Sequence, residues 1–167
     1  MIDHSIFLRN PSATVSSVSG LLSLDSGVTQ IIIDNGVSEG SFTELDVSRF
    51  SHLKSLVIGN HCFTFVNQLK MIGLGELESV EIGMNSFTKK KNWYGNDPNR
   101  HFYLKNCPKL KSLKMGRYSF SDYTVIEIEN VDALESIEMG NAINLNEASL
   151  NFYYALLELK SILVHSE

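Results

Sequence analysis

The stretch LKSLVIGNHCF at residues 53–63 decides the fold of this chain, because it recurs along the sequence at a nearly fixed spacing. Close copies read LESVEIGMNSF at 77–87, LKSLKMGRYSF at 110–120 and LESIEMGNAIN at 134–144. Weaker copies read VTQIIIDNG at 28–36 and LKSILVHSE at 159–167. Apart from one longer step between residues 77 and 110, the copies begin 24 or 25 residues apart. Such a period is typical of repeat proteins, in which each unit buries its apolar face against its neighbours.

Apolar residues occupy positions 1, 4 and 6 of every copy, as Leu53, Leu56 and Ile58 do in the first close copy. Their alternation predicts a short strand with one buried face. A second alternating pair lies eight residues before each of four leading leucines: Leu45/Val47, Leu69/Met71, Phe102/Leu104 and Ile126/Ile128. We therefore expect a mainly β chain, with two short strands per coil and little helix. Residues 145–158 are the exception, because their apolar spacing fits a helix as well as a strand.

Two further positions repeat. Position 11 is Phe63, Phe87 and Phe120 in three successive copies, which predicts a stacked aromatic row inside the coils. Position 7 is glycine in four copies: Gly59, Gly83, Gly116 and Gly140. Glycine there allows either a positive φ or a close approach of two backbones. The second strands end near Gly73, Asn106 and Asn130, which are residue types that suit a corner.

The L-x-x-L-x-L pattern resembles that of the leucine-rich-repeat family over residues 28–164. The copy at 77–87 comes closest, with Asn85 at position 9 and Phe87 at position 11, where the family has asparagine and an apolar residue. Position 9 is His61, Tyr118 or Ala142 in other copies, so we do not expect the family's asparagine ladder. The I-G-x-x-S-F string is similar to the I-G-x-x-A-F element of leucine-rich repeats in some protist and bacterial surface proteins. The resemblance implies a right-handed solenoid of about six coils that binds other proteins.

Residues 1–167 read as a single domain, which is the usual reading for a chain of this length. We expect residues 1–20 to form an irregular N-terminal cap. At the other end no polar cap follows the last copy. The chain is therefore a fragment of a longer array, or another chain covers that edge, or the stretch at 153–157 folds across it.

Charges of alternating sign mark the outward positions. Position 5 carries Glu81, Lys114 and Glu138 in successive copies, and position 3 is serine in five copies. One interpretation is a groove for a charged ligand. The other is a self-neutralising ladder that sets the register between coils.

The longer step adds about nine residues, which fall in TKKKNWYGNDPNR at 88–100. The turn-forming residues in this string predict a loop that projects from one edge. It carries four basic residues and one acidic residue, a charge of +3, which leaves −8 on the rest of the chain. Insertions in repeat proteins often mark the binding face, and exposed Trp, Tyr and Arg are frequent at binding hot spots. The candidate binding residues are Trp93, Tyr94, Lys89, Lys90, Lys91 and Arg100. Alternatively, Trp93 covers the flank of the coils and the lysines keep the loop soluble.

No catalytic or metal-binding spacing is present, so we expect neither an enzyme nor a cofactor. The net charge of −5 argues against nucleic acid as the partner. Cys62 and Cys107 fall about two coils apart, beyond disulfide reach, and we expect free thiols in a cytoplasmic protein. No stretch is apolar enough for a membrane span.

The sequence therefore predicts a protein-interaction module. The alternative is a structural or assembly element that self-associates through its C-terminal coil.

Overall fold

The computed structural model describes residues 12–89 and 97–140. These residues form a mainly β structure with two parallel sheets and one short helix. The six-stranded sheet contains β1 (Ser12–Val15), β2 (Gln30–Ile33), β4 (Ser55–Ile58), β6 (Ser79–Ile82), β8 (Ser112–Met115) and β10 (Ser136–Met139). The four-stranded sheet contains β3 (Glu44–Asp46), β5 (Gln68–Ile72), β7 (Asp97–Lys105) and β9 (Tyr123–Glu129).

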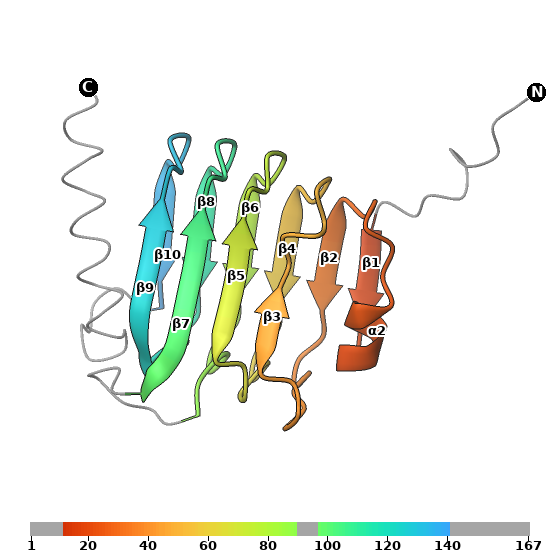
Figure 1. Cartoon of the computed structure of the whole chain (residues 1–167), viewed down its shortest axis with the longest axis vertical. Coiled ribbons are helices and arrows are strands. Elements are labelled where there is room, and N and C mark those ends of the chain that lie inside the picture. The colour runs from red at the N-terminus through yellow and green to blue at the C-terminus, as the bar shows by residue number, and fades with distance from the viewer. Residues whose placement is uncertain (1–11, 90–96, 141–167) are drawn as a thin grey trace, which may run out of the picture.

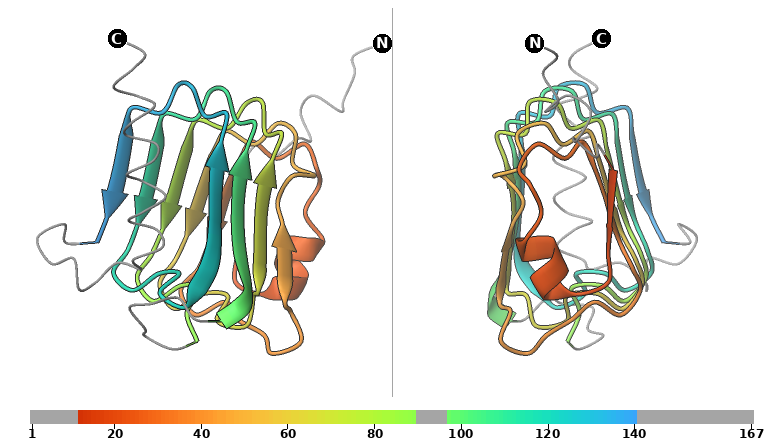
Figure 2. Two further views of the ribbon diagram at one scale, coloured as in Figure 1. Left: turned by 60° about the vertical axis from the view of Figure 1, so that its left-hand side comes forward. Right: turned by 90° about the vertical axis from the view of Figure 1, so that its right-hand side faces the viewer.

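From β2 onward the chain enters the two sheets in turn, so the strand order in each sheet follows the order along the chain. The view along the row of strands shows the sheets as two facing walls (Figure 2), and the side view shows successive strands next to one another (Figure 1). The expectation of two short strands per repeat and little helix is confirmed for these residues.

The repeats are stacked in register. Leu56 of β4 lies opposite Ile31 of β2 and Val80 of β6, and positions 6 are aligned in the same way. These side chains are almost fully buried between the sheets. Each repeat therefore covers the apolar face of the next, and one core runs through all the described repeats.

The predicted phenylalanine row is confirmed. Phe63, Phe87 and Phe120 are buried, with ring centroids 5.3 Å apart for the first pair and 4.8 Å for the second. The second pair is stacked, with an interplanar angle of 6°. All three residues have a positive φ, between 55° and 60°. A bulky side chain is costly in this region of backbone space, so packing must hold it there.

The glycines at position 7 mark close approaches between neighbouring repeats. A Cβ atom on Gly59 would lie 2.7 Å from the backbone nitrogen of Asn35 in the preceding repeat. Gly83 and Gly116 are equally crowded, so the close-approach alternative is correct at these three positions, while Gly140 has a positive φ. The predicted corners also hold: Gly73, Asn106 and Asn130 all have positive φ.

A row of short side chains at position 10 ties the turns together. Cys62 Sγ, Ser86 Oγ and Ser119 Oγ donate hydrogen bonds to backbone oxygens of the preceding repeat, those of Asp34, Gly59 and Gly83. Both cysteines are free and buried, as expected.

The described part of the expected N-terminal cap is regular rather than irregular structure. β1 pairs with β2, and α2 (Val18–Leu22) follows it and buries Val18 and Leu21 against the core. The Arg49 guanidinium donates to backbone oxygens at the end of α2 and just beyond it. Residues 12–22 thus form an ordered end to the core. Residues 1–11, the last repeat copy and the ambiguous stretch at 145–158 lie outside the described residues.

Candidate functional site

The three charged residues of position 5 lie on the outer face of the six-stranded sheet. Glu81 is on β6, Lys114 on β8 and Glu138 on β10, aligned in register. They line a shallow groove of about 190 Å³. We call it the serine groove, because its floor carries the serine row: Ser55, Ser79, Ser112 and Ser136.

The charges in the serine groove are weakly coupled. Lys114 Nζ lies 3.5 Å from Glu138 Oε2, and both side chains are more than half exposed. An exposed ion pair of this kind contributes about 0–1 kcal/mol to stability. The geometry is compatible with charge pairing between neighbouring coils, and the same charged side chains are also accessible to a ligand. Both interpretations of Glu81, Lys114 and Glu138 therefore remain.

The predicted loop residues Trp93, Tyr94, Lys90 and Lys91 lie outside the described residues. Lys89, the first lysine of the run, is exposed at the start of the insertion. Its Nζ lies 5.8 Å from the ring centroid of Phe65, a side chain that is 38% exposed. Lys89 and Phe65 therefore place one cation and one aromatic surface at the root of the insertion.

Arg100 is not an exposed loop residue, and that expectation was wrong. It belongs to β7, which begins at Asp97, so the insertion ends earlier than the turn-forming residues suggested. The side chain is fully buried. Arg100, Phe102 and Leu104 alternate along β7 and are all buried, so Arg100 extends the inward face of this strand beyond its apolar residues.

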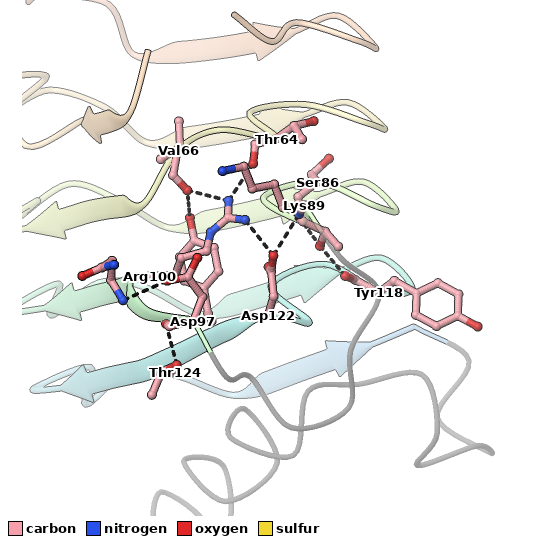
Figure 3. Close-up of polar contacts among 12 residues, drawn as sticks. Thr64, Val66, Ser86, Lys89, Asp97, Arg100, Tyr118, Asp122 and Thr124 are labelled. Atoms are coloured by element: carbon pink, nitrogen blue, oxygen red, sulfur yellow. Dashed lines mark hydrogen bonds and ion pairs between the residues drawn. The ribbon is translucent and has the colours of Figure 1, made fainter. Parts of the chain in front are cut away.

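The Arg100 guanidinium forms hydrogen bonds within a buried polar cluster (Figure 3). Its Nη1 donates to Asp122 Oδ2 at 2.8 Å, and its Nη2 donates to the carbonyl oxygens of Thr64 and Val66 at 2.7 and 2.8 Å. Tyr123 donates its hydroxyl to the same Val66 oxygen at 2.5 Å. A buried charge needs such a partner and such hydrogen bonds, because desolvation alone would cost several kcal/mol.

Asp122 joins the two ends of the insertion. The same oxygen, Oδ2, also accepts from the backbone N–H of Lys89 at 3.0 Å. Thr124 adds a further bond by donating to the carbonyl oxygen of Asp97 at 2.6 Å. Residues on both sides of the undescribed stretch at 90–96 are thus fastened to the following repeat. We refer to Lys89, Arg100 and Asp122 as the clamp.

Sequence reasoning missed Asp122. It follows Phe120 by two residues and carries no motif of its own. Its partner Arg100 was assigned to the loop because it is the last residue of the polar segment 88–100. The one available signal was the i, i+2 pattern of Arg100, Phe102 and Leu104, which extends the inward face of the strand to the arginine.

The described titratable groups show no prepared nucleophile. Burial raises the pKa of the Cys62 and Cys107 thiols, which disfavours the reactive thiolate. Burial likewise raises the pKa of the Tyr123 hydroxyl, so it serves as a hydrogen-bond donor. Within residues 12–89 and 97–140, no group of three His, Cys, Asp or Glu residues could hold a metal ion. In the same residues no helix is long and apolar enough to cross a bilayer.

Comparison of the chain with protein-family models, curated proteins and solved structures finds no match.

Proposed function

We propose that this chain is a protein-interaction module built on a right-handed leucine-rich-repeat-like solenoid, with the insertion as its main recognition element. The regular alternation between two parallel sheets and the in-register core support the solenoid. The repeats carry serines and charges of alternating sign, whereas the insertion combines the single tryptophan with a run of three lysines. In this proposal the protein is cytoplasmic, catalyses no reaction, needs no cofactor and does not bind nucleic acid.

The clamp is the observation that carries the proposal. A single buried carboxylate holds Lys89 and Arg100, which lie on either side of residues 90–96. Anchored ends lower the conformational entropy that a binding segment loses on association. A loop that only filled space between repeats would not require a buried ion pair at its base, since such pairs add little net stability.

The test is capture of a partner by the immobilised full chain, identification of that partner, and measurement of its association rate. Replacement of Lys89, Lys90 and Lys91 by alanine should slow association at least tenfold at low salt and flatten its salt dependence. The matched control removes the same charge elsewhere, at Lys54, Lys109 and Lys111. If both triple variants slow association equally, net charge alone steers the partner and the insertion has no special role.

The alternative function is assembly through the C-terminal end of the described repeats. Ile126, Ile128, Ile137 and Met139 are only partly buried, whereas most of the equivalent positions of the inner repeats are fully buried. Apolar surface of this kind is suited to packing against another polypeptide segment, such as that of a second copy of the protein. Sedimentation velocity over a hundredfold range of concentration separates the two: assembly predicts larger species at high concentration, and an unchanged monomer contradicts it.

A further inference from the structure

A second groove lies on the outer face of the four-stranded sheet, at the N-terminal ends of β3 and β5 and beside Asn99 and His101 of β7. It has a volume of about 240 Å³. We call it the amide groove, and its lining residues are Thr43, Glu44, Asn67, Gln68, Asn99 and His101. None of the candidate residues chosen from the sequence belongs to it.

Three carboxamides in this groove are unused by the fold. The side chains of Asn67, Gln68 and Asn99 have no hydrogen-bond partner among the described residues, although their backbones take part in the turns and the sheet. Each carboxamide presents two N–H donors and one oxygen acceptor. The groove therefore offers donors and acceptors together, held on three neighbouring repeats.

The charged groups of the groove are already satisfied internally. Glu44 Oε1 lies 2.6 Å from Lys70 Nζ, and this bond raises the pKa of Lys70. Both ring nitrogens of His101 are engaged, Nδ1 with the Tyr103 hydroxyl at 2.7 Å and Nε2 with the Pro98 carbonyl oxygen at 2.9 Å. The side chains of the groove that lack such a partner include the uncharged carboxamides.

The rest of this outer face is closed by ion pairs. Lys105 bonds to Glu127 on the neighbouring strand and lies 3.6 Å from Glu129. The amide groove thus differs both from this paired region and from the serine groove with its alternating charges.

The clamp fixes one end of the insertion at this groove. Asn99 directly precedes Arg100, whose guanidinium is anchored in the core. On the other side of the insertion, Lys89 lies over Phe65, two residues before Asn67. Residues on both sides of the stretch at 90–96 are thus close in sequence to residues that line the amide groove.

We propose that the amide groove binds an extended, uncharged stretch of polypeptide main chain from the partner; this rests on the proposed function. Each residue of a peptide presents one N–H donor and one C=O acceptor, which matches the carboxamides in kind. The three strands span two spacings of about 4.8 Å, which is roughly 10 Å or about three residues of extended chain.

The experiment uses linear peptides selected from a random phage-displayed library against the full chain, with affinities measured by calorimetry. The variant Asn67→Ala/Gln68→Ala/Asn99→Ala should keep its melting temperature, because these side chains make no internal hydrogen bonds. It should bind the selected peptides at least tenfold more weakly. The control variant Ser51→Ala/His52→Ala/Asp132→Ala lies in the turns at the opposite edge of the sheets and should bind as the parent does.

Three results would overturn the amide groove as a main-chain site. The first is undiminished binding by the triple variant, and the second is failure to select any peptide. The third is displacement of the selected peptides by neutral oligosaccharides such as maltohexaose. That result would mean that the carboxamides bind sugar hydroxyls instead of peptide main chain. Trp93→Ala separates this failure from failure of the proposed function. If the peptides bind more weakly to the Trp93→Ala variant but not to the triple variant, the insertion is the binding site and the amide groove is not. If neither variant weakens peptide binding, both proposals are contradicted.

Discussion

At each of three turns that leave the six-stranded sheet, a phenylalanine side chain points into the core from a backbone with positive φ. This conformation is uncommon for any residue with a Cβ atom. It persists because Phe63, Phe87 and Phe120 pack against one another in consecutive repeats. The same residues thus set the backbone path of each turn and fill the core beneath it.

We expect Phe87→Ala to lower the free energy of unfolding by about 3–5 kcal/mol, the usual cost of emptying an aromatic core site. Phe87 is the middle ring of the row, so its loss removes contacts to both neighbours. Urea unfolding measures the change. Phe65→Ala is the matched control, because Phe65 is 38% exposed and should cost less than about 1 kcal/mol. Equal midpoints for Phe87→Ala and the parent would show that the row does not support the fold.

Gly59→Ala should also destabilise the protein, for a different reason. Its Cβ would lie 2.6 Å from Asn35 Oδ1 and 2.7 Å from Asn35 N, so the backbones of two repeats must separate. Overpacking of this kind costs about 1–3 kcal/mol. Gly40→Ala meets nothing within 4 Å and should be neutral or slightly stabilising by the same urea titration. Similar effects at the two glycines would contradict the close approach.

At the scale of elements, the clamp makes the insertion part of the repeat that follows it. We expect Arg100→Met or Asp122→Leu alone to cost about 3–5 kcal/mol, since each leaves a buried charge without its partner. The double variant should cost clearly less than the sum, because residues in direct contact are coupled. Unfolding free energies of the four proteins give the coupling directly. Additive costs would mean that the two side chains act independently.

The strands could be predicted from the sequence because positions 4 and 6 of each repeat alternate with outward residues. The second strands followed from the same alternation, including Phe102 and Leu104 of β7. β1 was missed because its Ala13 and Val15 lack the leading leucine that marks the other copies. α2 was missed because a helix of five residues shows too little of the 3.6-residue period.

The candidate site could be predicted only in part. The position of Glu81, Lys114 and Glu138 on one outer face followed from the repeat register. The clamp could not be foreseen, because it joins Arg100 to Asp122 across two repeats through a contact that no local pattern encodes. The amide groove was missed for the same reason: its carboxamides come from separate repeats.

At the scale of the whole molecule, one core runs through the described repeats, and the sequence combines an acidic remainder with a basic insertion. The insertion's charge of +3 leaves −8 on the other residues, so the two parts carry net charges of opposite sign. Lys89 carries one of the insertion's charges at its root, and the clamp fixes that root. We therefore propose that stability depends on the stacked repeats and that recognition depends on the insertion.

The most direct test of that separation is Trp93→Ala, measured for both partner affinity and melting temperature. The account predicts that affinity falls by about 2 kcal/mol or more, roughly 30-fold, as expected of a hot spot. We also predict a melting temperature within about one degree of the parent's, as expected for a residue of a recognition loop outside the core. A clear drop in melting temperature with unchanged affinity would contradict the account, and would mean that Trp93 covers the flank of the repeats.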